Sequence, residues 1–215
     1  MKLIREVRDD VKVIQENKNG QKNLYLKGIF LQSEITNHNK RMYPEEIMDN
    51  EVKRYIKEKV EKKTALGELG HPDTPKLNLE RASHLIVELK KDGTNYLGKA
   101  KILPTPFGKT AQSLIEGGAR LGVSSRAVGT LKLNEDGIQV VQDDFLLSTA
   151  ADIVADPSAP DAFVDSIMEG REWAFINGNF VEQDVEYTKR RIRNAPLSQL
   201  EEEKLRMFKR FINKL

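Results

Sequence analysis

Residues 121–133 read Leu-Gly-Val-Ser-Ser-Arg-Ala-Val-Gly-Thr-Leu-Lys-Leu, and this stretch does most to decide the fold. Its residues alternate in the manner of a β-strand, and Ser124 lies within it. A further strand is expected over residues 145–154. Upstream, residues 82–89 and 96–103 flank an Asp-Gly turn, which is the signature of a β-hairpin. The middle of the chain therefore predicts antiparallel β structure.

Helical segments alternate with these strands along the chain. Pro44 suits the first turn of a helix that runs to about Lys62, with apolar residues at helical spacing. A second helix is predicted from about residue 107 to 117, where two glycines end it. Residues 24–34 suit a buried strand, and residues 63–80 are loop-like. These segments indicate an α+β fold.

The two ends of the chain differ from its middle. Residues 1–22 are polar and finish in a turn-like cluster, so we expect an N-terminal leader, strand-like or mobile, before a core over residues 23–165. Residues 166–215 form a C-terminal segment in which Ser198 and Glu201 have the spacing of a helix capping box. The amphipathic helix expected there has three alternative fates, namely packing on the core, binding a partner, or removal.

Composition limits the classes of function. The 215 residues include 35 Lys and Arg against 33 Asp and Glu, and this balance does not predict a nucleic-acid-binding surface over the whole protein. The absence of cysteine excludes disulfides, thiolate catalysis and cysteine-based zinc sites. No stretch approaches the roughly 20 apolar residues of a membrane span, and the first residues lack the apolar core of a signal peptide. We expect neither a nucleic-acid nor a membrane partner.

Ser124 offers a hydroxyl nucleophile between small residues. Because a serine hydroxyl is a weak nucleophile until a base takes its proton, the three histidines of the chain are the first candidates for that base. His71 is held between a glycine and a proline in a tight loop. Each histidine also has an ordinary explanation: His71 caps a turn, His84 is a strand residue with one face in solvent, and His38 is an exposed loop residue.

A third group should orient the imidazole and stabilise its charged form. The acidic candidates after Ser124 are Asp143, Asp144, Asp152 and Asp156. Asp152 is the most conspicuous, because it lies in an otherwise apolar strand where a buried carboxylate needs a partner. The alternative is an aspartate on an edge strand that faces water.

Two further interpretations concern the neighbours of these candidates. Arg126 is either an ordinary surface charge or a cation that fixes the oxyanion loop or neutralises charge in the transition state. Glu68, His71 and Asp73 are close enough in sequence to suggest a metal site for a hydrolase. They form an incomplete ligand set, however, and the HExxH motif is absent.

Five ordered blocks lie between residues 24 and 165. They are Gly-Ile-Phe-Leu-Gln at 28–32 with Glu34, Asn-Lys-Arg-Met-Tyr-Pro at 39–44, Ala-Leu-Gly-Glu-Leu-Gly-His-Pro at 65–72, Gly-Val-Ser-Ser-Arg at 122–126, and Pro-Ser-Ala-Pro-Asp-Ala at 157–162. Together they resemble the prohead maturation proteases of large contractile-tailed phages. Five blocks in the same order are far more specific than any one of them.

The resemblance implies a fold similar to that of the herpesvirus assemblin proteases, with a β-barrel-like core surrounded by helices. It implies a serine endopeptidase in which Ser124 is the nucleophile, His71 the base and Asp152 the third member. Backbone N–H groups near Ser125 and Arg126 would hold the oxyanion. No metal or organic cofactor is required.

The family's substrates are implied in the same way. These proteases cleave scaffold or core proteins and the major capsid protein inside the prohead, in the host cytoplasm, preferentially after glutamate with an aliphatic residue two positions earlier. Sites of this form end at Glu16, Glu169 and Glu202, so we expect self-processing of the terminal segments. Self-association is compatible with this role. The alternative function is a non-enzymatic scaffold or core protein of the capsid with the same fold.

Overall fold

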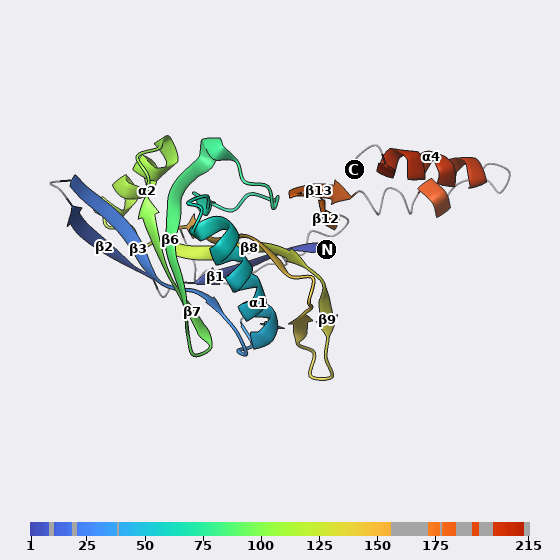
Figure 1. The fold of residues 1–215 in the computed structure, drawn as a ribbon, viewed down its shortest axis with the longest axis horizontal. Helices are drawn as coiled ribbons and strands as arrows, with labels where there is room; N and C mark the ends of the chain where they lie inside the picture. The colour runs from blue at the N-terminus through green and yellow to red at the C-terminus, as the bar shows by residue number, and fades with distance from the viewer. Residues whose placement is uncertain are drawn as a thin grey trace.

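The computed structural model describes residues 1–8, 11–18, 21–37, 39–155, 172–176, 178–183, 191–193 and 200–212. Within these ranges the chain has a mixed α+β fold in which antiparallel sheets predominate and helices are few (Figure 1). The α+β class expected from the sequence is confirmed. The barrel-like, herpesvirus-protease-like arrangement stays a prediction.

The largest sheet has five strands, and every neighbouring pair in it is antiparallel. In spatial order the strands are β2 (Val11–Lys18), β3 (Gln21–Gln32), β7 (Asn95–Ile102), β6 (Ala82–Asp92) and β5 (Leu66–Glu68). The predicted hairpin is confirmed, since β6 and β7 meet at a turn where Gly93 has a φ of 60°. That backbone conformation favours glycine.

A three-stranded sheet carries the segment on which the fold prediction rested. It has the order β1 (Lys2–Arg8), β8 (Gly122–Gly129) and β11 (Leu146–Val154), again antiparallel. Every residue of β8 is buried, because this central strand has a partner on each edge and side chains packed on both faces. The main apolar core includes residues from both sheets, among them Ile4, Phe30 and Val123.

The N-terminal residues belong to these sheets. The sequence predicts a strand-like or mobile leader over residues 1–22. Residues 2–8 and 11–18 are strands, and they pair with β8 and β3. Leu3 and Ile4 are fully buried. Charged residues beside them give the segment a polar composition. Composition alone cannot show that adjacent apolar side chains lie on opposite faces of a strand and that each is buried in a core.

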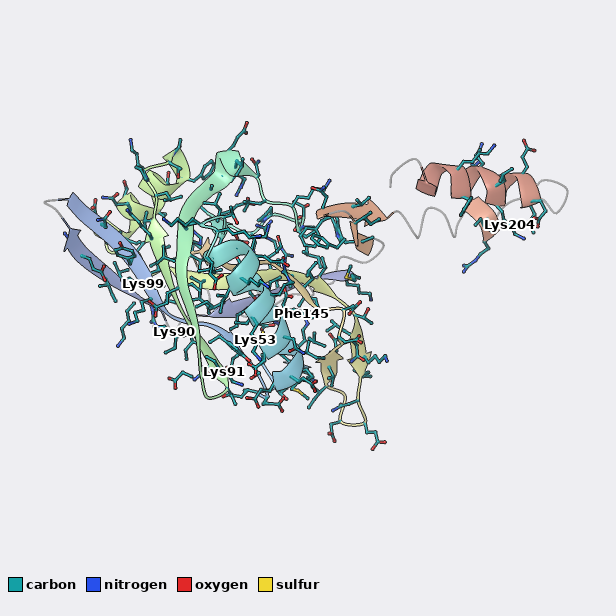
Figure 2. The ribbon with its side chains drawn as sticks, viewed as in Figure 1. Lys53, Lys90, Lys91, Lys99, Phe145 and Lys204 are labelled. Atoms are coloured by element: carbon teal, nitrogen blue, oxygen red, sulfur yellow. The ribbon has the colours of Figure 1, made fainter. Side chains whose placement is uncertain are left out.

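Helices cover parts of the sheets. The structure contains α1 (Glu45–Tyr55), which continues as a π-helical turn η1 (Ile56–Val60), α2 (Pro106–Glu116), a short 3-10 turn η2 (Leu79–Arg81), and α4 (Leu200–Ile212). The three predicted helices are confirmed. Thr105 begins α2 by accepting a hydrogen bond from Gly108 N. Lys91 of β6, labelled in Figure 2, forms ion pairs with Glu45 and Asp49 of α1 and so links the sheet to this helix.

Smaller elements complete the described chain. They are a sheet of β4 (Arg41–Met42), β10 (Gln139–Val141) and β9 (Leu131–Leu133), and a hairpin of β12 (Glu172–Ile176) and β13 (Asn179–Gln183). The hairpin was not expected from the sequence. Its Trp173 packs against Leu3 and Val128, so it lies beside β1. In the described ranges, no helix is long and apolar enough to span a membrane.

Candidate active site

Ser124 lies at the centre of the three-stranded sheet. It is opposite Val7 of β1 and opposite Asp152 of β11, and its side chain is fully buried. Because residues opposite each other in a sheet point to the same face, Ser124 and Asp152 share one face. The two residues that the sequence placed 28 positions apart are thus cross-strand neighbours.

A β-bulge places Asp152 in this position. The register between β8 and β11 pairs Arg126 with Thr149 and Ser124 with Asp152, so Ala150 and Ala151 lie opposite Ser125 alone. Bulges re-aim side chains and are frequent beside active sites. The carboxylate of Asp152 is fully buried, so the alternative of an edge-strand aspartate that faces water is wrong.

His71 reaches the same face from the loop that follows β5. Gly70 has a φ of 83°, a conformation that favours glycine, and its N–H donates to the carbonyl of Ile153 at 2.7 Å. This anchor on β11 brings His71 Nδ1 to 3.5 Å from Asp152 Oδ2. A carboxylate on this side favours the tautomer that carries its proton on Nδ1, which leaves Nε2 as the free base.

The hydroxyl of Ser124 does not bond to the imidazole. Ser124 Oγ donates to the backbone carbonyl of Glu6 at 2.7 Å, and His71 Nε2 is buried without a hydrogen-bond partner among the described residues. The structure therefore brings together Ser124, Asp152 and His71 on one face but leaves the hydroxyl turned toward β1. The candidate base and the candidate nucleophile are therefore not hydrogen-bonded to each other in this structure.

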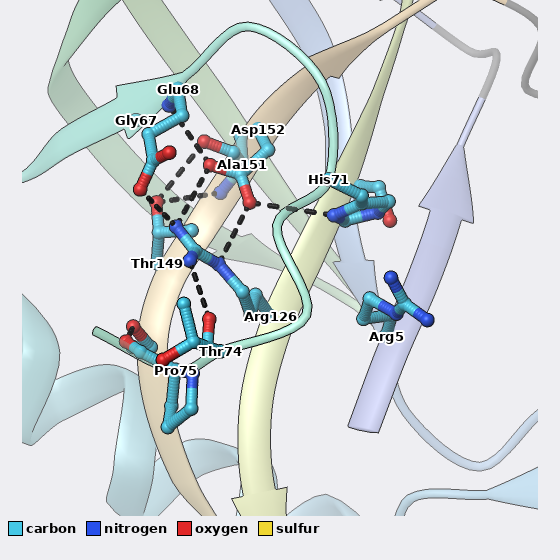
Figure 3. A network of polar contacts seen from close by, with 12 residues as sticks. Arg5, Gly67, Glu68, His71, Thr74, Pro75, Arg126, Thr149, Ala151 and Asp152 are labelled. Atoms are coloured by element: carbon cyan, nitrogen blue, oxygen red, sulfur yellow. Dashed lines mark hydrogen bonds and ion pairs between the residues drawn. The ribbon is translucent and has the colours of Figure 1, made fainter. Parts of the chain in front are cut away.

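Arg126 lies at the centre of a buried ionic cluster (Figure 3). Its Nε lies 2.9 Å from Asp152 Oδ2, and its Nη2 lies 3.0 Å from Glu68 Oε1. All three side chains are inaccessible to solvent, and Glu68 Oε2 also faces Arg81 Nε at 3.4 Å. The two carboxylates and two guanidinium groups balance in charge, as buried ions require. Arg126 is therefore not a surface charge.

The same guanidinium holds the loop that carries His71. Arg126 Nη1 donates to the carbonyls of Thr74 and Lys76 at 2.7 and 3.1 Å, and Ser148 Oγ donates to the carbonyl of Pro75. The donors of Arg126 are thus shared between two carboxylates and two carbonyls. This geometry favours a positioning role, and a direct oxyanion contact would require one of these partners to leave.

A model of the prohead core protein serine protease family matches residues 6–172. The chain is also 40% identical over 144 residues to the prohead core protein protease of Enterobacteria phage T4, which covers 66% of this chain and 68% of that protein. The solved structure of the bacteriophage T4 capsid assembly protease, gp21, matches with a TM-score of 0.66 and 32% identity, over 71% of this chain and 97% of that one.

The chain belongs to the prohead core protein serine protease family. The resemblance read from the five blocks is confirmed at the level of the family. One of those blocks, residues 157–162, lies outside the described residues, as do Asp156 and His38.

Another histidine, His84, is hydrogen-bonded to a serine hydroxyl, and this pair is part of the buried core. His84 is fully buried, with Nδ1 2.9 Å from Ser83 Oγ and Nε2 2.9 Å from the carbonyl of Ala151. The sequence predicts that one side of His84 faces solvent. This prediction is wrong, because strand β5 covers the imidazole. Gly67 on β5 permits this cover, since a Cβ there would lie 2.2 Å from His84 Nε2. Burial lowers the pKa of His84 below its ordinary value.

The remaining candidates have other partners. Asp143 is exposed, and Asp144 accepts from the backbone N and the hydroxyl of Thr130. The suggested metal ligands do not converge, because Glu68 is paired with arginines and Asp73 is paired with Arg5. Within the described ranges no group of three acidic or histidine side chains is placed to hold a metal ion.

Sequence reasoning did not find the role of Glu68 in this prohead protease family member. Its backbone N–H donates to Asp152 Oδ1 at 2.9 Å, and its carboxylate divides between Arg126 and Arg81. The signal in the sequence was its place in the block that carries His71.

An open cavity of about 570 Å³ lies between β2, β3, β7 and α2, and none of the candidate residues line it.

Proposed function

We propose that this chain is the serine endopeptidase of a phage prohead, with Ser124 as nucleophile, His71 as general base and Asp152 as the orienting acid. The observation that carries the proposal is the placement of Asp152, which is opposite Ser124 in register and 3.5 Å from His71 Nδ1. Membership of the prohead protease family supports the reaction class.

The reaction is acyl transfer in two steps. His71 Nε2 takes the proton of Ser124 as Oγ attacks the scissile carbonyl, and Asp152 stabilises the imidazolium that forms. His71 then protonates the leaving amine, and water releases the acyl group. The oxyanion would be held by backbone N–H groups at Ser125 and Arg126. The bulge on β11 supports this assignment, since it interrupts the β8–β11 pairing opposite Ser125.

The resting arrangement must change before substrate binds. Ser124 and Asp152 are fully buried, whereas the side chain of His71 is 17% exposed. The Ser124 hydroxyl must leave the carbonyl of Glu6 and turn to His71 Nε2. Catalytic hydrogen bonds are often absent or long before substrate is bound, so this geometry is compatible with a precursor.

The substrates proposed are the scaffold or core proteins and the capsid protein of the prohead. Cleavage follows glutamate, the site of action is the interior of the prohead in the host cytoplasm, and the protease also processes its own ends. A non-enzymatic scaffold with the same fold is the second candidate, and it would use the β12–β13 hairpin and α4 for assembly only.

The substitution Ser124→Ala separates the two functions. Co-expression of the variant with the prohead proteins should yield assembled particles whose proteins stay uncleaved, and gel electrophoresis with mass spectrometry detects this. Ser125→Ala is the matched control, because it removes the neighbouring hydroxyl and keeps the backbone N–H. Processing that continues in Ser124→Ala would refute the protease mechanism. If the wild type still processes its substrates in the presence of metal chelators, a metal-dependent hydrolase is excluded.

A further inference from the structure

Arg5 is a cation on the same face as the candidate nucleophile. In the β1–β8 register Arg5 lies opposite Arg126 and Val7 lies opposite Ser124, so Arg5 is one side-chain row away from the serine. It precedes Glu6, whose carbonyl accepts the Ser124 hydroxyl. Its Nη1 bonds to Asp73, two residues after His71, so Arg5 contacts the loop that carries the imidazole.

Arg5 differs from the other arginines of the site in its partner. The guanidinium of Arg126 is surrounded by buried carboxylates and backbone carbonyls, and Arg81 is paired with Glu68. Arg5 Nη1 donates at 3.2 Å to Asp73 Oδ1, and the Asp73 side chain is 68% exposed. Exposed ion pairs of this kind contribute little to stability, so another carboxylate can replace Asp73 at low cost.

The position of Asp73 indicates what Arg5 binds. Asp73 follows His71 by two residues in the same loop, and its carboxylate is paired with Arg5. A guanidinium recognises carboxylates through paired, directional hydrogen bonds, which a neutral amide cannot reproduce. A substrate side chain that enters beside His71 therefore meets a cation whose present partner is an exposed acid.

We propose that Arg5 is a specificity-determining residue that binds the acidic side chain of the substrate residue whose carbonyl Ser124 attacks. Asp73 occupies this position at rest, and the substrate carboxylate replaces it. The inference rests on the proposed protease function. Arg5 lies just before residues 6–172, which the family model matches, so membership of the family does not assign this role.

The test uses peptides that differ only in the residue before the scissile bond, which is Glu, Gln or Lys. The full chain, activated by co-assembly with its prohead proteins, is assayed as wild type and as Arg5→Gln, Arg5→Lys and Asp73→Asn. The readout is the ratio of kcat/KM for the Glu peptide to that for the Gln peptide. A ratio taken within one preparation does not depend on the fraction of active enzyme.

We expect Arg5→Gln to lower the Glu-to-Gln ratio by roughly tenfold or more, the usual effect of losing a charge-assisted hydrogen bond. Arg5→Lys should give a Glu-to-Gln ratio between those of the wild type and Arg5→Gln, because lysine keeps the positive charge but lacks the paired donors of a guanidinium. Asp73→Asn should lower KM for the Glu peptide alone, since the competing carboxylate is gone. Lys2→Gln is the matched control, because Lys2 is an exposed cation on the opposite face of β1, and it should keep the wild-type ratio.

Three results would overturn the inference. They are a wild type that does not distinguish Glu from Gln, an Arg5→Gln variant with the wild-type ratio, and an Asp73→Asn variant with unchanged KM for both peptides. The Asp73→Asn result can be measured even if the Arg5→Gln variant does not fold, so the inference stays testable in that case. Peptide cleavage that persists in Ser124→Ala contradicts the proposed function instead, so the two failures are distinguishable.

Discussion

Asp152 has three contacts that a single carboxylate must satisfy together. It faces His71 Nδ1, it is ion-paired with Arg126, and it accepts the backbone N–H of Glu68. The sequence could indicate that Asp152 needs a partner, because it lies in an apolar strand. It could not show which partner, since Arg126 and Glu68 become neighbours only through the register of β8 and the course of β5.

Asp152→Asn should separate orientation from packing, since the amide has nearly the same shape. We expect kcat to fall by roughly 10³–10⁴, because an amide cannot stabilise the imidazolium and can favour the wrong tautomer of His71. Thermal unfolding should also shift downward, since Arg126 loses one of its two buried carboxylates. Asp143→Asn removes an exposed acid and is the control. Activity of Asp152→Asn within about tenfold of wild type would contradict the role of Asp152.

His84 should make the fold sensitive to mild acid. Burial lowers its pKa in the folded state, so the unfolded chain binds a proton below pH 6.5 that the folded chain does not accept. The free energy of unfolding should therefore fall as pH falls below about 6.5, by at most about 1.4 kcal/mol per pH unit. Urea denaturation between pH 7.5 and 5.5 measures this slope. His84→Gln should flatten it, and an unchanged slope would contradict the assignment.

The elements that the sequence predicted best have strong local signals. The β6–β7 hairpin has a glycine turn and alternating strands, and α2 has a capping threonine followed by proline. The features it did not predict depend on distant partners. β1 acquires its place from pairing with β8, more than 110 residues later, and β12 lies beside β1 through Trp173. Periodicity within a short polar segment carries no information about such pairing.

Leu3→Ala tests whether β1 is part of the core or a removable leader. Leu3 is fully buried against Val128 and Trp173, so its truncation should lower the free energy of unfolding by about 2–5 kcal/mol. Lys2→Ala, at the exposed neighbouring position, should change it by less than about 0.5 kcal/mol. Chemical denaturation followed by circular dichroism makes the comparison. Equal, small effects of the two substitutions would show that β1 is dispensable.

At the scale of the whole molecule, two of the three expected self-cleavage sites lie in regular structure. Glu16 lies in β2, which is paired with β3, and its carboxylate is 2.5 Å from Lys99 Nζ. Glu202 lies in α4. Glu169 lies outside the described residues. Since proteases bind substrates as extended segments, the bonds after Glu16 and Glu202 become accessible only when regular structure opens locally.

Mass spectrometry of the protease recovered from assembled particles tests self-processing. We expect cleavage after Glu16 and Glu202 to be slower than cleavage of the other prohead proteins, because both bonds lie in regular structure. The comparison variant is Glu169→Gln, which should keep the bond after this residue intact without affecting cleavage of the other prohead proteins. Intact termini in active, assembled particles would mean that the protease does not process itself.

The most direct test of the account is to identify the reactive residue with a fluorophosphonate probe. The probe is applied to the protease in assembling particles, and the labelled peptide is sequenced by mass spectrometry. We predict a single modification on Ser124, lost in His71→Ala, and slower labelling of the isolated chain because Ser124 is buried and bonded to Glu6. Label on Ser125, or full cleavage activity without any label at Ser124, would contradict the assignment.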